Sequence, residues 1–479
     1  MLNQGLSRLG LRLLDTLTDI APRTIPRIFH KLLFTVVGGR LYYRFQIARY
    51  RRKLASCKDL SKILIIPDLN IGDSLVLEPA IQFMQRVFPQ SDVHYVCNKI
   101  GGELLRAMPG VTVHSVFEAN GGMPTAKDLQ GLETILRRER FTVTLTLSPF
   151  LPKQALRNAG DVVRLYIPFG FFVVRAWALG RTTHISQFLR GFLEVLFAHG
   201  PMDDPQVPST RANAHEGANN LRFELPVINN SVEEGNAVYL RYSEIRRANE
   251  WLSTRRLPSA GSLVFLNPDA TSKYGQMPFD LQLDLINQLL RSTDVTLLVG
   301  SAYADRGIER SLRESAPADF RRRIHIVPHV TIECYAAIID ACDVFISSDG
   351  GPLHLSATRK FTESGQLMRN TTLIVTVHGA TDSRMYGYDS TAPNHLAANQ
   401  DAPSIVFSAN AGCRNITCIN KWGKSCKTVR CFEGLETSNI GDYIENYLHD
   451  LQISRHLNQQ VVALNSDQES VTDHAYSRV

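Results

Sequence analysis

Two series of short apolar stretches, each stretch followed by a helical pattern, restrict the fold of this chain more than any other feature. In the first half we expect strands at 63–66, 93–96, 111–116 and 141–147. In the second half we expect them at 263–266, 295–299, 324–327, 344–347 and 373–377. Strands that alternate with helices pair in parallel, so each half is predicted to form its own α/β sheet. The 479 residues leave room for two or three domains.

Changes in composition suggest where these domains begin and end. We expect a basic extension at 1–62, a first α/β domain at 63–240, a second at 241–453 and a polar tail at 454–479. Pro79 is suited to open the helix after the first strand. Ser438 or Asn439 can cap a closing helix that we expect to end at Leu451.

The extension at 1–62 has a larger net positive charge than the chain as a whole. It holds 13 Lys and Arg against three acidic residues, whereas the whole chain has a net charge of +6. An amphipathic element on an anionic membrane surface would have this composition, and so would a helical extension packed on the body with a solvated basic face. The overall charge is too small to indicate nucleic-acid binding. With no apolar run long enough to span a bilayer and no signal peptide, we expect a cytoplasmic protein, with any contact to the inner membrane made by the extension.

The stretch that follows the expected strand at 344–347 is the strongest candidate for a binding site. It reads Asp349-Gly350-Gly351-Pro352-Leu353-His354 and leads into a helix. Open parallel sheets bind ligands at the carboxyl ends of their strands, and glycines let backbone N–H groups approach a phosphate. A single His at a helix start is more often structural. Here its neighbours favour a phosphosugar site made by Asp349, Gly350, Gly351 and His354.

A second acidic residue, Asp73, follows Gly72 at the strand-to-helix turn of the first half. A carboxylate there can accept a proton from an attacking hydroxyl, or it can simply cap the helix, and spacing alone favours the cap. Asp73 and Asp349 lie in different halves of the chain, which suggests two sheet domains that face one cleft.

Two weaker signals also follow strands of the second half. Thr271, Ser272 and Lys273 come after the strand at 263–266, and small hydroxyl residues with a lysine suit a diphosphate. Asp305 comes after the strand at 295–299, where a carboxylate can hold ribose hydroxyls. The alternative for Thr271 to Lys273 is an ordinary polar loop, and the alternative for Asp305 is a surface carboxylate without a binding role.

Four cysteines, Cys413, Cys418, Cys426 and Cys431, fall within 19 residues near the end of the second domain. In a cytosolic protein such a cluster suggests Zn²⁺ or iron bound by thiolates, although the spacing is not that of a standard zinc finger. Disulfides and free thiols remain as alternatives. A metal held by four protein sulfurs would be structural, because no open coordination position is left.

Together these blocks resemble the heptosyltransferase family, glycosyltransferase family nine. The residues that carry the resemblance are Gly72-Asp73, Phe88-Pro89, Pro109-Gly110-Val111, Asn267-Pro268-Asp269-Ala270, Lys273, Asp349 to Leu355, and His378-Gly379-Ala380-Thr381-Asp382. Lys273 stands two residues out of register with the family lysine, and Gly350 replaces a Ser or Thr. Residues 358–371 look like an insertion.

The resemblance implies the GT-B architecture, in which two Rossmann-like domains face a central cleft. It also implies inverting transfer of a heptose from a nucleotide diphosphate donor, ADP-heptose in most members, to a bacterial surface glycan such as the lipopolysaccharide core, with no catalytic metal. By this resemblance Asp73 is the general base and Lys273 neutralises the departing diphosphate. Gly350 and Gly351 offer backbone donors to it.

By the same resemblance Asp349 and His354 orient the donor, and Asp305 and Val330 lie near its ribose and adenine. Two alternatives remain open from the sequence. One is a protein O-heptosyltransferase in which the cysteine cluster organises an oligomer or holds iron. The other is a non-catalytic protein that binds nucleotide sugars.

Overall fold

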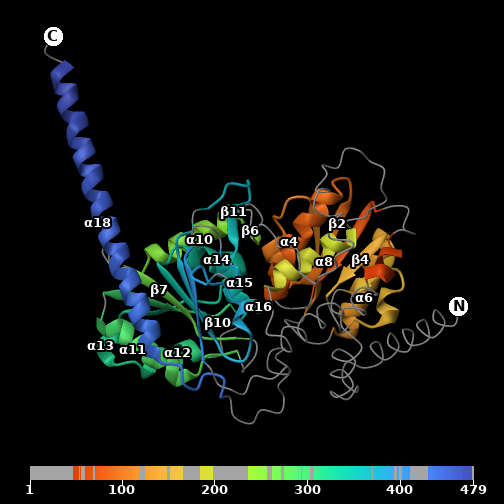
Figure 1. The fold of residues 1–479 in the computed structure, drawn as a ribbon, viewed down its shortest axis with the longest axis horizontal. Coiled ribbons are helices and arrows are strands. Elements are labelled where there is room, and N and C mark those ends of the chain that lie inside the picture. Colours follow the sequence, from red (N-terminus) through yellow and green to blue (C-terminus); the bar gives the residue numbers. More distant parts are fainter. Residues whose placement is uncertain are drawn as a thin grey trace.

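The protein folds into two α/β lobes that lie side by side (Figure 1). The computed structural model describes residues 47–52, 54, 60–67, 71–118, 124–147, 151–164, 184–197, 236–255, 261–270, 275–292, 294–302, 307–368, 370–392, 396, 398, 402–409 and 430–476. Each lobe is built around a sheet whose strands are all parallel. The expectation of one parallel sheet in each half is confirmed.

The first lobe holds a five-stranded sheet in the order β3-β2-β1-β4-β5. Its strands are β1 Lys62–Ile66, β2 Asp92–Asn98, β3 Val111–Phe117, β4 Val143–Thr146 and β5 Asp161–Arg164. Its helices are α4 Ile71–Val87, α5 Lys99–Leu105, α6 Ala126–Glu139 and α8 Ile185–Phe197, with a short 3₁₀ helix, η1, at Lys153–Leu156. The central strands are apolar and buried because helices cover both faces of a parallel sheet.

The second lobe holds a six-stranded sheet in the order β13-β12-β10-β7-β8-β9. Its strands are β7 Ser262–Asn267, β8 Val295–Val299, β9 Ile324–Ile326, β10 Val344–Ser348, β12 Leu373–His378 and β13 Ser404–Ser408. The helices are α10 Tyr242–Ser253, α11 Phe279–Ser292, α12 Ile308–Ser315, α13 Ala318–Arg321, α14 Ile332–Asp340, α15 Gly351–Ala357, α16 Ser383–Tyr386 and α18 Thr437–Tyr476. Both strand orders are doubly wound. In each lobe the first three strands are added outward in one direction, and the later strands are added on the other side of the first strand.

A separate two-stranded parallel sheet joins β6, Ala237–Leu240, to β11, Arg359–Thr362. β11 occupies the stretch at 358–371 that the sequence suggested to be an insertion. β6 lies within the range expected for the first domain, yet it pairs with a strand of the second half. This small sheet therefore connects the two parts of the chain.

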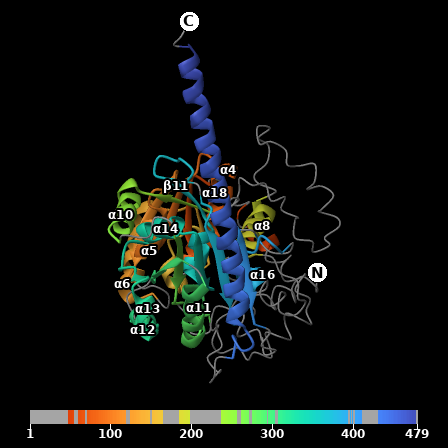
Figure 2. The same cartoon turned by 90° about the vertical axis from the view of Figure 1, so that its left-hand side faces the viewer.

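Two helices differ from the sequence-based expectation. Pro79 was expected to open a helix, but it lies inside α4, which already begins at Ile71. The helix tolerates the missing N–H because its residues on both sides of Pro79 are buried and packed. α18 begins at Thr437 and continues to Tyr476, well past Leu451 (Figure 2).

The lobes share one cluster of buried apolar side chains. It includes Leu75 of α4 and Phe192 of α8 in the first lobe, and Phe265 of β7 and Tyr335 of α14 in the second. Packing of this kind fixes how the first turns of helices from the two lobes meet.

Part of the basic extension belongs to the same core. Ile47, Tyr50 and Leu54 are buried in the shared cluster, and the Tyr50 hydroxyl lies 3.3 Å from the Arg164 carbonyl oxygen. This segment thus packs on the body, as one of the two sequence-based interpretations expects. Among the described helices, none is long and apolar enough to cross a membrane.

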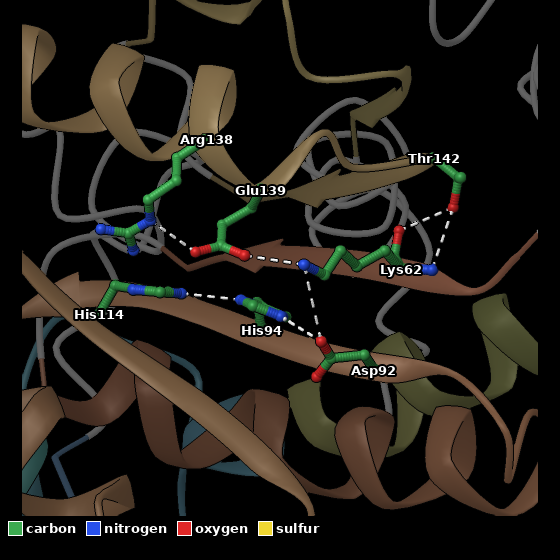
Figure 3. A network of polar contacts seen from close by, with 7 residues as sticks. All are labelled: Lys62, Asp92, His94, His114, Arg138, Glu139 and Thr142. Carbon is green, nitrogen blue, oxygen red and sulfur yellow. Dashed lines mark hydrogen bonds and ion pairs between the residues drawn. The ribbon is translucent and has the colours of Figure 1, made fainter.

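A polar network closes the amino edge of the first sheet (Figure 3). His94 bonds through Nδ1 to His114 Nε2 at 2.8 Å and through Nε2 to Asp92 Oδ2 at 2.7 Å. Lys62 at the start of β1 pairs with Glu139 at the end of α6 at 2.7 Å. Burial and the neighbouring His94 lower the pKa of His114. The network ties strand starts to a helix end, at the edge opposite to Asp73.

Candidate active site

The carboxyl edge of the second sheet has its reversal point between β7 and β10, which pair directly. The loop after β7 begins at Pro268, and the turn after β10 begins at Asp349. A crevice between such diverging loops is where open α/β sheets bind their ligands. The two segments that the sequence suggested for the second half, the loop after β7 and the turn after β10, therefore begin at the edge where folds of this kind bind ligands.

Buried polar side chains fix the loop after β7. Asn267 donates from Nδ2 to the Asp269 carbonyl oxygen at 2.7 Å and to Ser347 Oγ at 3.2 Å. The Tyr335 hydroxyl lies 3.0 Å from Asn267 Oδ1. Ser301, which follows β8, approaches the Asp269 carboxylate at 3.5 Å. These contacts hold the start of the loop after β7 in place with buried polar side chains.

The turn after β10 is buried and passes directly into α15. Asp349 is 1% exposed and His354 is 5% exposed. Gly350 has φ 178°, an extended value that any residue adopts. A Cβ placed there would have Pro352 Cδ as its nearest neighbour, at 3.7 Å. The fold itself therefore does not require glycine at 350.

Asp73 lies in the first turn of α4 and is half-buried. It is the third residue of the helix, so it is not the N-cap that spacing alone favours. The preceding Gly72 packs against α15, because a Cβ at Gly72 would lie 2.8 Å from His354 Cδ2 and 3.6 Å from Gly351 Cα. The structure therefore brings together the two turns predicted to face one cleft.

Tyr386, the last residue of α16, lies among acidic residues from both lobes. Burial raises its pKa most, and the charges of Asp349, Asp73 and Asp382 raise it further. The hydroxyl consequently keeps its proton at neutral pH and can act as a hydrogen-bond donor.

Aromatic and imidazole rings fill the space beside His354. Tyr388 Oη lies 3.0 Å from His354 Nδ1, and the ring of His184 lies 4.7 Å from the ring of Tyr388. His184 Nδ1 bonds to Ser186 Oγ at 2.7 Å. Burial lowers the pKa of His184 well below its usual value, and the neighbouring His354 and His378 lower it further. His184 is therefore neutral.

Comparison with solved structures identifies this architecture. No family model and no curated protein matches the sequence. The ADP-heptose lipopolysaccharide heptosyltransferase II of E. coli superimposes with a TM-score of 0.52 at 13% identity, over 82% of this chain and 99% of that one. A family 9 glycosyltransferase of Veillonella parvula gives a TM-score of 0.54 at 13% identity, over 83% and 99%. The chain has the fold of a GT-B glycosyltransferase.

In this GT-B fold, several predicted site residues belong to the second-half loops. Asp349 and Gly350 lie on the turn before α15, and Gly351 and His354 lie within the first four residues of α15, as the sequence suggested. Val330 is half-buried in the loop between β9 and α14. Thr271, Ser272, Lys273 and Asp305 lie outside the described residues, so their assignments stay predictions.

The metal prediction also remains a prediction. Cys413, Cys418 and Cys426 lie outside the described residues, whereas Cys431 is buried just before α18. Within the ranges that the structure describes, no group of three His, Cys, Asp or Glu is arranged to hold a metal ion.

Sequence reasoning missed four residues around His354, namely His184, Asn236, Tyr386 and Tyr388. They come from three segments that are far apart in the chain. Asn236 and Tyr388, for example, are 152 positions apart and meet only in the folded protein. The one local signal was the block from His378 to Asp382, which directly precedes the two tyrosines.

Proposed function

We propose that this protein is an inverting glycosyltransferase that moves a heptose from ADP-heptose to a bacterial surface glycan such as the lipopolysaccharide core. The observation that carries the proposal is the packing of the Gly72–Asp73 turn against Gly351 and His354 across the two lobes. The similarity in fold to an ADP-heptose lipopolysaccharide heptosyltransferase supports this choice of donor and acceptor. A basic extension at 1–62 suits an acceptor at an anionic membrane surface.

Inversion requires a base on the acceptor and stabilisation of the leaving group on the donor. Asp73 takes the proton of an acceptor hydroxyl while the oxygen attacks the anomeric carbon from the face opposite the diphosphate. The bond from that carbon to the diphosphate oxygen breaks, and its electron pair leaves with ADP. Backbone N–H groups around Gly350 and Gly351 meet the developing negative charge, and the predicted Lys273 adds a positive charge. The proposal assigns no step to a metal ion.

Transfer by the purified full-length protein tests this function. The assay measures ADP release from ADP-heptose with lipopolysaccharide core lacking the terminal heptose, with a protein acceptor and with no acceptor. We expect release that depends on the glycan acceptor. Release that depends only on the protein acceptor would favour protein O-heptosylation, and nucleotide-sugar binding without release would favour a non-catalytic binder. Either result would overturn the proposal.

Asp73→Asn tests the role of the base. We expect transfer to fall by about 10²–10⁴-fold, the usual contribution of a general base, while ADP binding is retained. Asp319→Asn is the matched control, because Asp319 is an exposed carboxylate that also lies in the first turn of a helix, α13. Full activity of the Asp73 variant would refute the assignment.

A further inference from the structure

Tyr388 is a buried tyrosine with two polar neighbours from different parts of the chain. Its hydroxyl oxygen lies 3.0 Å from His354 Nδ1 and 3.4 Å from Nδ2 of Asn236. Tyr388 is 2% exposed, His354 5% and Asn236 7%. At this burial, water cannot readily replace either partner of the hydroxyl.

The donor and acceptor of each hydrogen bond from Asn236 through Tyr388 to His354 can be assigned in turn. The amide nitrogen of Asn236 can only donate, so Tyr388 Oη accepts from it. Burial raises the pKa of Tyr388, so the hydroxyl keeps its single proton. Directing that proton at His354 Nδ1 gives the buried O–H an acceptor, whereas an Nδ1–H that donates to Tyr388 would leave the O–H with no acceptor in these two contacts. We therefore take Nδ1 as the acceptor. A neutral imidazole that accepts at Nδ1 carries its own proton on Nε2.

The opposite side of the His354 ring faces the turn that carries Asp73. A Cβ at Gly72 would lie 3.6 Å from His354 Nε2. An N–H at this atom can donate to an anionic oxygen, whereas the other tautomer would present a lone pair and repel it.

We propose that Tyr388, oriented by Asn236, is a positioning residue that holds His354 in the tautomer protonated at Nε2. His354 thereby offers a fixed donor to an oxygen of the sugar donor's diphosphate. The identity of that oxygen rests on the proposed transferase function, but the tautomer does not. The neighbouring His184 is consistent with this arrangement, because it is neutral and so places no cation beside the imidazole.

Two variants separate this role from simple packing. Tyr388→Phe keeps the ring and removes the hydroxyl. Asn236→Asp, studied at a pH at which the new carboxyl group is ionised, replaces the donating amide by a carboxylate that only accepts, so Tyr388 gives its proton to position 236 and accepts one from His354 Nδ1. In Tyr388→Phe, neither tautomer of His354 is favoured by this hydrogen bond. In Asn236→Asp, the tautomer protonated at Nδ1 is favoured instead. Tyr443→Phe on α18, whose ring packs on Phe407, is the matched control.

The direct readout is ¹⁵N NMR of the full-length protein labelled at histidine, with His354→Gln used to assign the signal. We expect Nε2–H in the wild type and the control, a mixture in Tyr388→Phe and Nδ1–H in Asn236→Asp. If the carboxylate variant does not fold, Tyr388→Phe alone decides. A wild-type His354 protonated at Nδ1, or a tautomer unchanged in Tyr388→Phe, would overturn the proposal.

The second readout is transfer from ADP-heptose. We expect Tyr388→Phe to lower kcat/KM by about tenfold, mainly through kcat, because the donor acts on the departing diphosphate. Unchanged kcat/KM in a variant whose tautomer has changed would show that His354 does not act in this way. If even the wild type transfers no sugar, the proposed function fails, and the NMR result still decides the tautomer.

Discussion

Replacing Glu78 by Gln should change how the stability of this protein depends on pH. Glu78 lies in the middle of α4 and is fully buried. Its carboxylate accepts hydrogen bonds from the backbone N–H of Ala237, at 2.9 Å, and from the Gln82 amide. Burial raises the pKa of Glu78 from 4.5 to about 8, although these hydrogen bonds, Arg359 and Arg86 oppose the rise.

The direction of the effect follows from the raised pKa. The folded protein holds the Glu78 proton more tightly than the unfolded chain, so this group contributes stability that is fully present below pH 4.5 and is lost as the pH rises through about 8. The shift corresponds to about 5 kcal/mol in the free energy of unfolding, at about 1.36 kcal/mol per pKa unit. The amide of Gln has no proton to lose, so Glu78→Gln lacks this dependence.

Urea unfolding at several values between about pH 5 and pH 8 measures the effect. The difference between wild type and Glu78→Gln cancels the titration of the other groups. We expect the wild type to lose several kcal/mol relative to the variant as the pH rises. Glu250→Gln, an exposed glutamate on α10, should follow the wild type at every pH. A difference between wild type and Glu78→Gln that stays constant over this range would refute the reasoning.

Two further predictions concern glycine contacts and a buried ion pair. Gly72→Ala should lower thermal stability because its Cβ would lie 2.8 Å from His354 Cδ2, whereas Gly350→Ala has room and should fold with unchanged or slightly higher stability. Equal melting temperatures of the two variants would contradict the packing described. Lys360 is fully buried and pairs with Asp340 at 2.8 Å, so Lys360→Met should cost about 3–5 kcal/mol of unfolding free energy by leaving a buried carboxylate unpaired. Chemical denaturation tests this, and the double variant with Asp340→Leu should recover most of the loss.

The sequence predicted the central strands well because their signal is local. Residues 63–66 and 344–347 form short apolar runs that are buried on both faces, and such runs are typical of parallel sheets. The start of α14 is equally local, since the side chain of Thr331 accepts from the Cys334 N–H three residues later. β5 at Asp161–Arg164 was missed because a polar residue stands at each end of only four residues.

Features that depend on contacts between the lobes could not be predicted. Nothing near Pro79 in the sequence indicates that α4 continues through it, because burial of the surrounding residues offsets the local cost. Asp73 and His354 could be proposed from their motifs, but Tyr388 and His184 meet His354 only through tertiary packing. Motif-based reasoning therefore proposed Asp73 and His354 but missed the residues that reach His354 only in the folded protein.

β6 has a consequence for any movement of the lobes. The backbone N–H of its first residue, Ala237, donates to the Glu78 carboxylate of α4. All four residues of β6 pair with β11 of the second lobe. Ala237 is thus held from both sides within one residue of Asn236. A change in the angle between the lobes would therefore act on this four-residue strand from both sides, because Glu78 accepts from its first N–H and β11 pairs along its length.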